Sequence, residues 1–275
     1  MNYRHIFHAG NHADVLKHAA LLATLARMQR KKTPLAVIET HAGIGLYDLD
    51  GPAAARSPEW RFGIGALMGS EAPSLRPLLQ AVAAVNPGGG LRFYPGSPEL
   101  ARLTLRPQDR YAGCELHPED AAALKARYAG DKRLQIHARD GWEALKALLP
   151  PAERRGLVLI DPPYETPGEA GLAAQAVRGA LRRFGHGVYL WWRPLKDPGG
   201  IARADAELFG EGPLPAVEAQ LTLSGLSQGL TGSSVLIVNP PFGLAEDLAA
   251  LTDAIAEALP TALQPQARVL ARGAC

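Results

Sequence analysis

The stretch "RLQIHARDGWEALKALLPPAERRGLVLIDPPYE" (133–165) contains the unit from which the fold is built. Its two ends, 133–138 and 156–161, are short apolar segments that we predict to be β-strands. The segment between them has apolar residues at helical spacing over 141–149. A strand, a helix and a second strand in this order predict a βαβ unit, in which the two strands are parallel.

The same alternation extends over most of the chain. Strand patterns occur at seven places, which are 34–39, 110–116, 133–138, 156–161, 187–192, 216–223 and 233–239. Helical patterns accompany them at 12–30, 119–128, 141–149 and 169–184. We therefore expect an α/β fold with a seven-stranded, mostly parallel sheet. Only "SGLSQGLTG" (224–232) separates the last two strands, which are predicted to form an antiparallel C-terminal hairpin.

The first and second strands are separated by roughly seventy residues, far more than one crossover helix needs. Helical patterns at about 58–69 and 74–85 predict a small helical insertion at about 48–92, resting on the ligand edge of the sheet. The core restarts at "RFYPGSPELARLTL" (92–105), where we expect Ser97 to be a helix N-cap and Pro98 the first helical residue. Residues 1–275 are predicted to form a single domain.

Composition limits the class of protein but not the substrate. The 275 residues are 47% hydrophobic, yet neither a membrane-length apolar run nor a signal peptide is present, so we expect a cytoplasmic protein without membrane contact. The two cysteines, Cys114 and Cys275, offer neither a disulfide framework nor a cysteine zinc site. A net charge of +2 is too small to identify a nucleic-acid partner, although it permits a local basic face.

Ligands of open parallel sheets bind beyond the carboxyl ends of the strands, so the residues after each strand are informative. The first strand leads into "ETHAGIG" (39–45), where Gly43 lets the backbone approach a ligand closely. The second ends in Glu115, which is placed to accept hydrogen bonds from ribose hydroxyls. The third is followed by Asp140, a candidate acceptor for an adenine amino group, and Gly141, which opens a helix. A solvated strand end or a helix N-cap is the alternative for each acid, but acids at successive strand ends favour a nucleotide site.

Two motifs, "LVLIDPPYE" (157–165) and "VLIVNPPFG" (235–243), pair an acid or amide with two prolines and an aromatic ring. This arrangement suits methylation of an amino nitrogen. The lone pair of an adenine amine is delocalised into the ring, and two hydrogen-bond acceptors can localise it toward a methyl donor. In the first motif Asp161 and the carbonyl of Pro162 would be these acceptors, and Tyr164 would stack on an extruded base.

Strand direction separates the two motifs. Asp161 follows a parallel strand and lies on the same edge as 39–45, Glu115 and Asp140. Asn239 follows the second strand of a predicted hairpin and is delivered to the opposite edge. We therefore assign catalysis to Asp161 and interpret Asn239 as part of a turn.

These motifs together resemble the class I methyltransferases that use S-adenosylmethionine and have a Rossmann-like core. The block "YRHIFHAGNHADVLKH" (3–18), with "THAGIGLYDL", "RFYPGSPELARLTLR", "CELHP", "RRGLVLIDPPYE" and "NPPF", resembles the RlmJ family of bacterial 23S ribosomal RNA adenine-N6 methyltransferases. The resemblance runs from Tyr3 to about residue 243. It implies methylation of one adenine in ribosomal RNA that is protein-free or partly assembled, by a monomer.

The resemblance also implies roles for individual residues. The expected cofactor contacts are His18, His41, Gly43, Ser97, Glu115, Asp140, Gly141 and Asp161. The expected catalytic residues are Asp161, Pro162 and Tyr164, and the expected substrate contacts are Tyr3, His5, Lys17 and Tyr164. The segment 196–230 matches no motif, which leaves its RNA contacts unassigned.

Several alternatives stay open on sequence alone. The histidines at 5, 8, 12 and 18 do not share one helical face and lack a nearby cysteine, so we expect no metal and assign them hydrogen bonds to backbone, cofactor or RNA phosphate. The N-terminal arm either orders over RNA or packs on the protein. One of Trp191 and Trp192 fills the core, and the other, with Arg193, is a candidate for the base pocket. Competing functions are a DNA adenine-N6 methyltransferase and a non-catalytic RNA-binding protein.

Overall fold

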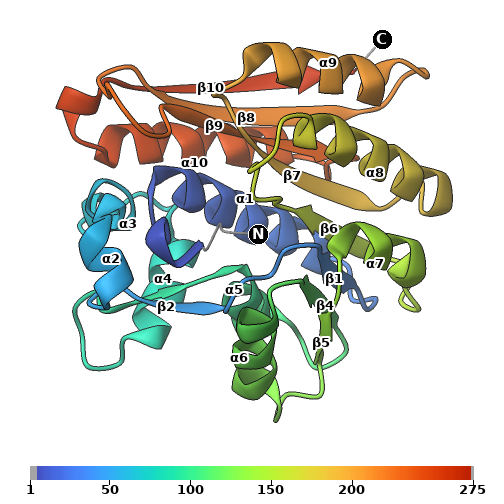
Figure 1. Cartoon of the computed structure of the whole chain (residues 1–275), viewed down its shortest axis with the longest axis horizontal. Coiled ribbons are helices and arrows are strands. Elements are labelled where there is room, and N and C mark those ends of the chain that lie inside the picture. Colours follow the sequence, from blue (N-terminus) through green and yellow to red (C-terminus); the bar gives the residue numbers. More distant parts are fainter. Residues whose placement is uncertain (1–4, 274–275) are drawn as a thin grey trace.

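A sheet of eight strands crosses the centre of the computed structural model, of which residues 5–273 are described (Figure 1). The strand order across the sheet is β10-β8-β9-β7-β6-β1-β4-β5. The strands are β1 (Ala36–Glu39), β4 (Arg110–Glu115), β5 (Leu134–Ala138), β6 (Gly156–Ile160), β7 (Val188–Pro194), β8 (Ala216–Leu223), β9 (Gly232–Val238) and β10 (Pro265–Arg272). All seven predicted strands are confirmed.

Strand directions follow the prediction as well. The pairs β5–β4, β4–β1, β1–β6 and β6–β7 are parallel. β9 is antiparallel to both β7 and β8, so the predicted hairpin is confirmed and β8 runs in the same direction as the parallel strands. The eighth strand, β10, pairs antiparallel with β8 over its full length and was not predicted. It has no buried residue, so it carries no apolar run that would identify it.

Helices cover both faces of the sheet (Figure 1). One apolar core lies under α1 (His12–Gln29), α5 (Ser97–Thr104), α6 (Pro118–Tyr128) and α10 (Leu244–Ala258). The other lies under α7 (Gly141–Leu148), α8 (Glu169–Arg183) and α9 (Pro198–Phe209). Alternate residues of each buried strand serve the two cores: Val37 faces the first and Ile38 the second, as strand geometry requires. A short helix, η3 (Thr261–Leu263), precedes β10.

The segment between β1 and β4 carries additional elements. The two short strands β2 (Leu46–Asp48) and β3 (Phe93–Pro95) pair with each other, and helices lie between them: α2 (Pro52–Arg56), η2 (Glu59–Phe62), α3 (Ile64–Leu67) and α4 (Arg76–Val85). The N-terminal arm with η1 (His5–Phe7) packs on this segment. The amide of Ile64 donates to the Gly10 carbonyl at 2.9 Å, and a Cβ on Gly63 would be 2.1 Å from that carbonyl oxygen. Close backbone contact therefore fixes the arm beside the inserted helices.

Ser97 differs from its predicted role in the helix. The N-cap of α5 is Gly96, and Ser97 is the first helical residue. The prediction that Ser97 caps the helix is wrong, because its hydroxyl donates to the buried carboxylate of Glu39 instead. A hydrogen bond between these distant parts of the chain could not be read from the local sequence.

A buried ion-pair network joins the C-terminal half of the sheet to α9. Arg193 on β7 is fully buried and donates to Asp205 on α9 and to Glu218 on β8. Arg272 on β10 donates to the second oxygen of Glu218 at 2.7 Å and to Asp205 at 3.3 Å. Arg193 therefore belongs to this network and does not line a base pocket. No helix within residues 5–273 is long and apolar enough to cross a membrane.

This network gives a prediction for stability. Replacing Arg193→Met should lower the free energy of unfolding by about 3–5 kcal/mol, because Glu218 then keeps a buried charge with too little compensation. The double variant Arg193→Met with Glu218→Met should show a smaller decrease in the free energy of unfolding, since it removes both charges. Urea denaturation of the three proteins measures the difference. A single variant at least as stable as the double variant would show that the pair is not electrostatically coupled.

Candidate active site

The loop after β1 is bound to the end of β4. Gly43 has a φ of +62°, and its amide donates to Oε2 of Glu115 at 2.8 Å. A Cβ at this position would be 2.4 Å from the Tyr47 hydroxyl, so the loop has room only for glycine. Oε1 of Glu115 accepts from the amide of His117 at 2.8 Å. Both carboxylate oxygens are thus fixed at the mouth of the sheet.

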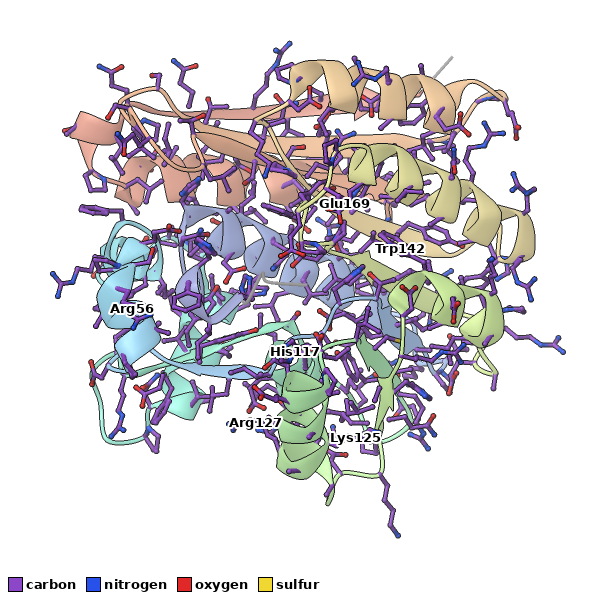
Figure 2. All side chains as sticks on the ribbon, viewed as in Figure 1. Arg56, His117, Lys125, Arg127, Trp142 and Glu169 are labelled. Atoms are coloured by element: carbon purple, nitrogen blue, oxygen red, sulfur yellow. The ribbon has the colours of Figure 1, made fainter. Side chains whose placement is uncertain are left out.

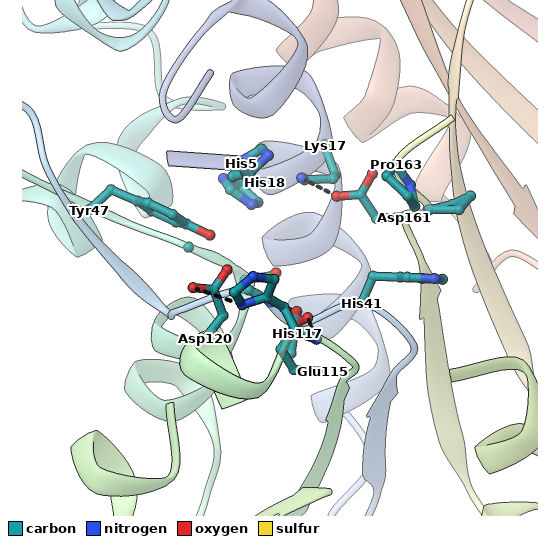
Figure 3. Close-up of a pocket in the computed structure, with 15 residues that line it drawn as sticks. His5, Lys17, His18, His41, Tyr47, Glu115, His117, Asp120, Asp161 and Pro163 are labelled. Atoms are coloured by element: carbon teal, nitrogen blue, oxygen red, sulfur yellow. Dashed lines mark hydrogen bonds and ion pairs between the residues drawn. The ribbon is translucent and has the colours of Figure 1, made fainter. Parts of the chain in front are cut away.

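A cavity opens at this edge, and we call it the first cavity (Figure 3). It is lined by His5, Lys17, His18, His41, Ala42, Gly43, Tyr47, Gly96, Ser97, Glu115, His117, Asp120, Asp161, Pro162 and Pro163. The expected cofactor residues among these are His18, His41, Gly43, Ser97, Glu115 and Asp161. Figure 3 shows Glu115, His117 and Asp120 on one side and Lys17 with Asp161 across from them. Residues from five separate segments therefore meet at one place.

Asp140 and Gly141 do not line the first cavity. Oδ1 of Asp140 accepts from the amides of Trp142 and Glu143, at 2.7 and 3.0 Å, and so caps α7. Gly141 packs against the backbone of Thr40, where a Cβ would be 2.1 Å from the carbonyl oxygen. Oδ1 of Asp140 is therefore a helix cap, which is the alternative considered for this acid. A contact of Asp140 with adenine stays a prediction.

Two histidines of the site, the buried His18 and the partly buried His41, are neutral at pH 7. Burial lowers the pKa of His18 to about 3 and that of His41 to about 4. Nδ1 of His18 is hydrogen-bonded to the Tyr94 hydroxyl at 2.7 Å, and Nδ1 of His41 to the Thr40 hydroxyl at 2.8 Å. In the described part of the chain, no three His, Cys, Asp or Glu residues are grouped as metal ligands. These rings therefore serve as neutral hydrogen-bonding groups.

Asp161 lies at the end of β6 and is joined to α1 by an ion pair. Its Oδ2 accepts from Nζ of Lys17 at 2.5 Å, and the same ammonium is 2.8 Å from Oδ1 of Asp14. Oδ2 of Asp14 accepts from Nε2 of His5 at 2.7 Å. Burial disfavours the charge of Lys17, but the two carboxylates outweigh it and raise its pKa well above the usual value. Lys17 therefore stays charged and holds Asp161 in place.

A second cavity, of about 250 Å³, lies on the other side of Asp161. It shares His5, Lys17, Asp161 and Pro163 with the first cavity. Its remaining walls are His8, Asn11, Ala13, Asp14, Glu59, Tyr164, Trp192, Pro194, Lys196, Gly229 and Leu230. Asp161 thus stands at the boundary between two cavities, which is the arrangement that a group transfer between two ligands requires.

Tyr164 lines only the second of these cavities. Its hydroxyl donates to the carbonyl of Trp192 at 2.8 Å and accepts from Nε1 of Trp191 at 2.7 Å. Two hydrogen bonds therefore fix the ring beside Asp161. Trp191 is buried in the core, and Trp192 is the tryptophan that lines the cavity.

Some residues of this site were not found from sequence. Glu59 of the inserted helix η2 lines the second cavity and accepts from Asn11 at 2.9 Å. Lys196 lies in the segment that matched no motif. Neither residue has a local sequence signal, because only tertiary packing brings it to Asp161. Tyr3 lies outside the described residues, so its predicted substrate contact stays a prediction.

Asn239 is far from both cavities, as predicted. Its amide nitrogen donates to the carbonyls of Gly185 and Gly187 at 2.9 and 2.8 Å, immediately before β7 begins. Asp161 follows the carboxyl end of β6, which is parallel to β7. The two proline motifs therefore lie at opposite edges of the sheet.

Glu39 is a buried carboxyl group next to the first cavity. It is 1% exposed and accepts from the hydroxyls of Ser97 and Tyr111. Burial raises its pKa to about 7, and these two hydrogen bonds only partly oppose that effect. Glu39 therefore changes its charge near neutral pH.

Comparison with known proteins agrees with this geometry. A family model described as "Ribosomal RNA large subunit methyltransferase D, RlmJ" matches residues 32–270. The chain belongs to this family. Ribosomal RNA large subunit methyltransferase J of Escherichia coli strain K12 is 37% identical to this RlmJ-family chain over 252 residues, 90% of each chain. The Haemophilus influenzae protein of the same name is 36% identical over 89% of each chain.

A solved structure extends the comparison to the whole RlmJ-family fold. The crystal structure of a Legionella pneumophila protein superposes with a TM-score of 0.88 at 30% identity and covers 98% of this chain and 100% of its own. The inserted helices and the strands at the C-terminal end of the sheet are therefore part of a shared architecture.

The ionisation of Glu39 gives a pH prediction. The pKa of Glu39 is about 7 in the folded protein, and its ordinary value is 4.5. Ionisation of this group therefore lowers the free energy of unfolding by up to about 3 kcal/mol as the pH rises from 4.5 to 7. Glu39→Gln removes the charge and should gain stability relative to the wild type over this range. Urea denaturation at pH 5 and pH 8 measures the difference. A stability difference that does not change with pH would contradict the raised pKa.

Proposed function

We propose that this protein transfers a methyl group from S-adenosylmethionine to N6 of an adenine in 23S ribosomal RNA. The observation that carries the proposal is the position of Asp161, with Pro162, Pro163 and Tyr164, between two cavities. The first cavity suits the methyl donor and the second suits an unpaired or extruded base. The names of the family and of its relatives support ribosomal RNA as the substrate.

The residues of the first cavity fit a nucleoside cofactor. Gly43 has no Cβ, so the loop leaves room for a ligand at this wall of the cavity. The carboxylate of Glu115 lies next to the Gly43 amide. His117 lines the cavity, and its Nδ1 makes no hydrogen bond among the described residues but lies 3.8 Å from Oδ1 of Asp120, so a ligand hydroxyl could bind there. S-adenosylmethionine supplies an electrophilic methyl group when bound. His18, His41, Ser97, Asp140 with Gly141, and Asp161 would complete its contacts.

Asp161 would act on the amine by accepting one of its hydrogen bonds. Lys17 occupies Oδ2, which leaves Oδ1 as the acceptor that faces a substrate. The carbonyl of Pro162 would accept the other N–H, so that the lone pair points away from the ring plane toward the first cavity. Tyr164 would stack on the base. The proton would leave after transfer, because the nitrogen becomes acidic only once methylated.

The proposal also covers the residues on the substrate side, the state of the RNA and the organisation of the chain. His5 and Lys17 line both cavities and are placed on the substrate side, and Tyr3 would join them from the arm. The substrate would be protein-free or partly assembled ribosomal RNA, modified in the cytoplasm by a monomer. Residues 1–275 would act as one methyltransferase domain, with the helical insertion at about 48–92 forming one wall of the second cavity through Glu59.

The central test compares the two proline motifs. Asp161→Asn should lower kcat on protein-free 23S ribosomal RNA by about 10²–10³-fold, because an amide is a poorer acceptor for the amine. Asn239→Ala should keep kcat, since Asn239 lies at the opposite edge of the sheet. Methyl incorporation and mapping of N6-methyladenine measure both. An active Asp161 variant beside a dead Asn239 variant would reverse the assignment, and methylation of duplex DNA in place of RNA would reject the substrate.

A second prediction tests the cofactor loop. Gly43→Ala should weaken binding of S-adenosylmethionine by at least about tenfold, because alanine is strained at a φ of +62° and its Cβ would displace Tyr47. Gly88→Ala is the matched control, since a Cβ there meets no atom within 4 Å. Isothermal titration calorimetry on both variants measures the affinity. Equal affinities would show that the loop does not contact the cofactor.

A further inference from the structure

The second proline motif forms a rigid turn at the edge of the sheet opposite the active site. Asn239 has a φ of +53°, and its amide donates to the Gly185 and Gly187 carbonyls. Its backbone amide donates to the carbonyl of Pro215 at 2.8 Å. Two prolines follow, which restrict the backbone further. The turn 239–243 is thus fixed although it takes no part in the catalytic site.

The turn presents a phenylalanine to solvent. The side chain of Phe242 is 98% exposed, whereas the next most exposed large apolar residue among those described, Leu172, is 55% exposed. The carbonyl of Phe242 accepts from Nη1 of Arg27 at 3.2 Å, and Arg27 is in turn held by Asp247. These contacts hold the backbone of the turn that carries the exposed ring. An exposed aromatic ring on a turn whose backbone is held in place is available to stack on a planar ring of a ligand.

Basic side chains surround this ring. Beside Phe242 lies a depression of about 560 Å³ whose basic lining residues are Arg27, Arg30, Lys31, Arg155 and His186. Arg30 and Lys31 are exposed and have no ion-pair partner in residues 5–273. Arg155 donates to the carbonyls at the end of α1, which orients its guanidinium beside them. Of the two acids near Arg27, Asp247 is paired with it, whereas Glu246 is exposed and adds a negative charge beside the depression.

We propose that this surface, formed by Phe242, Arg30, Lys31 and Arg155 and called here the Phe242 surface, binds a single-stranded segment of the RNA substrate. The inference rests on the proposed function and adds a second contact region to it. An exposed ring stacks on a base of any sequence, and neighbouring cations follow the phosphates. Unpaired positive charges around an aromatic ring suit this ligand better than they suit an apolar protein partner.

Helix α1 connects the two regions. Lys17 of this helix reaches Asp161, and Arg30 at its C-terminal cap borders the Phe242 surface. Thirteen residues of helix separate them, which is about 20 Å. Figure 1 shows α1 beside α10, the helix that follows the turn. A large folded RNA can therefore contact both regions, and the Phe242 surface would contribute to RNA binding without touching the reacting adenine.

Substitution of the ring separates binding from chemistry. Phe242→Ala should raise KM for protein-free 23S ribosomal RNA by about 10- to 100-fold and leave kcat and the affinity for S-adenosylmethionine unchanged. Phe242→Trp should keep the wild-type KM because it can still stack. Leu172→Ala on α8 is the control for loss of an exposed apolar side chain. A KM within twofold of the wild type for Phe242→Ala would overturn the proposal.

The charges are tested through salt dependence. The double variant Arg30→Gln with Lys31→Gln should reduce the slope of log affinity for this RNA against log salt by about 0.7 for each lost phosphate contact. Lys125→Gln with Arg127→Gln makes the same charge change on α6 (Figure 2) and should leave the slope unchanged. Filter binding from about 50 to 300 mM KCl, roughly a sixfold range of salt, measures the slope. An unchanged slope in the first variant would overturn the proposal.

The outcomes distinguish this proposal from the proposed function. If the wild type binds ribosomal RNA through Phe242 but does not methylate it, the proposed function fails and the surface stands. If the wild type methylates the RNA, and either Phe242→Ala keeps the wild-type KM or Arg30→Gln with Lys31→Gln keeps the wild-type salt slope, the surface proposal fails alone. In that case, a Phe242-dependent dimer in sedimentation velocity would assign the surface to a second copy of the chain.

Discussion

The common direction of the parallel strands is the constraint on which the candidate active site depends. β1, β4 and β6 lie side by side and all end at one edge of the sheet, so the loop of Gly43, the carboxylate of Glu115 and Asp161 meet there. These residues are far apart in the sequence, but pairing of their strands brings them close together in space. The hydrogen bond from the Gly43 amide to Glu115 then fixes the loop against the neighbouring strand end. Strand direction, more than any single motif, creates the site.

Buried charges at this edge are stabilised by one another. Asp161, Lys17, Asp14 and His5 form a continuous chain of short contacts from β6 to the N-terminal arm. Burial opposes the charges of Lys17 and Asp14, so each of these two needs its neighbours, and the chain of contacts holds Asp161 in position. The same chain places Lys17 and His5 in the walls of both cavities. The residues that support Asp161 therefore also line both cavities.

The two proline motifs show how context changes the role of similar residues. Asp161 follows a strand that runs toward the cofactor edge, whereas Asn239 follows β9, which runs the other way. The first therefore contributes an acceptor between two cavities. The second uses its amide to fix a turn and exposes Phe242 beside the basic end of α1. Nearly identical local chemistry places an acceptor between two cavities at one edge and a surface feature at the other.

Sequence by itself determined seven of the eight strands of the large sheet, their order in the α/β alternation and the placement of Asp161 and Asn239 at opposite edges. These features depend on local apolar patterns and on strand direction, which the lengths of the connections reveal. Sequence did not determine β10, whose residues are not buried and whose pairing needs β8. It also misplaced the hydroxyl of Ser97 and gave no signal for Glu59 or Lys196. Those roles were decided only by tertiary structure, because hydrogen bonds and cavity walls between distant segments exist only after the segments have packed together.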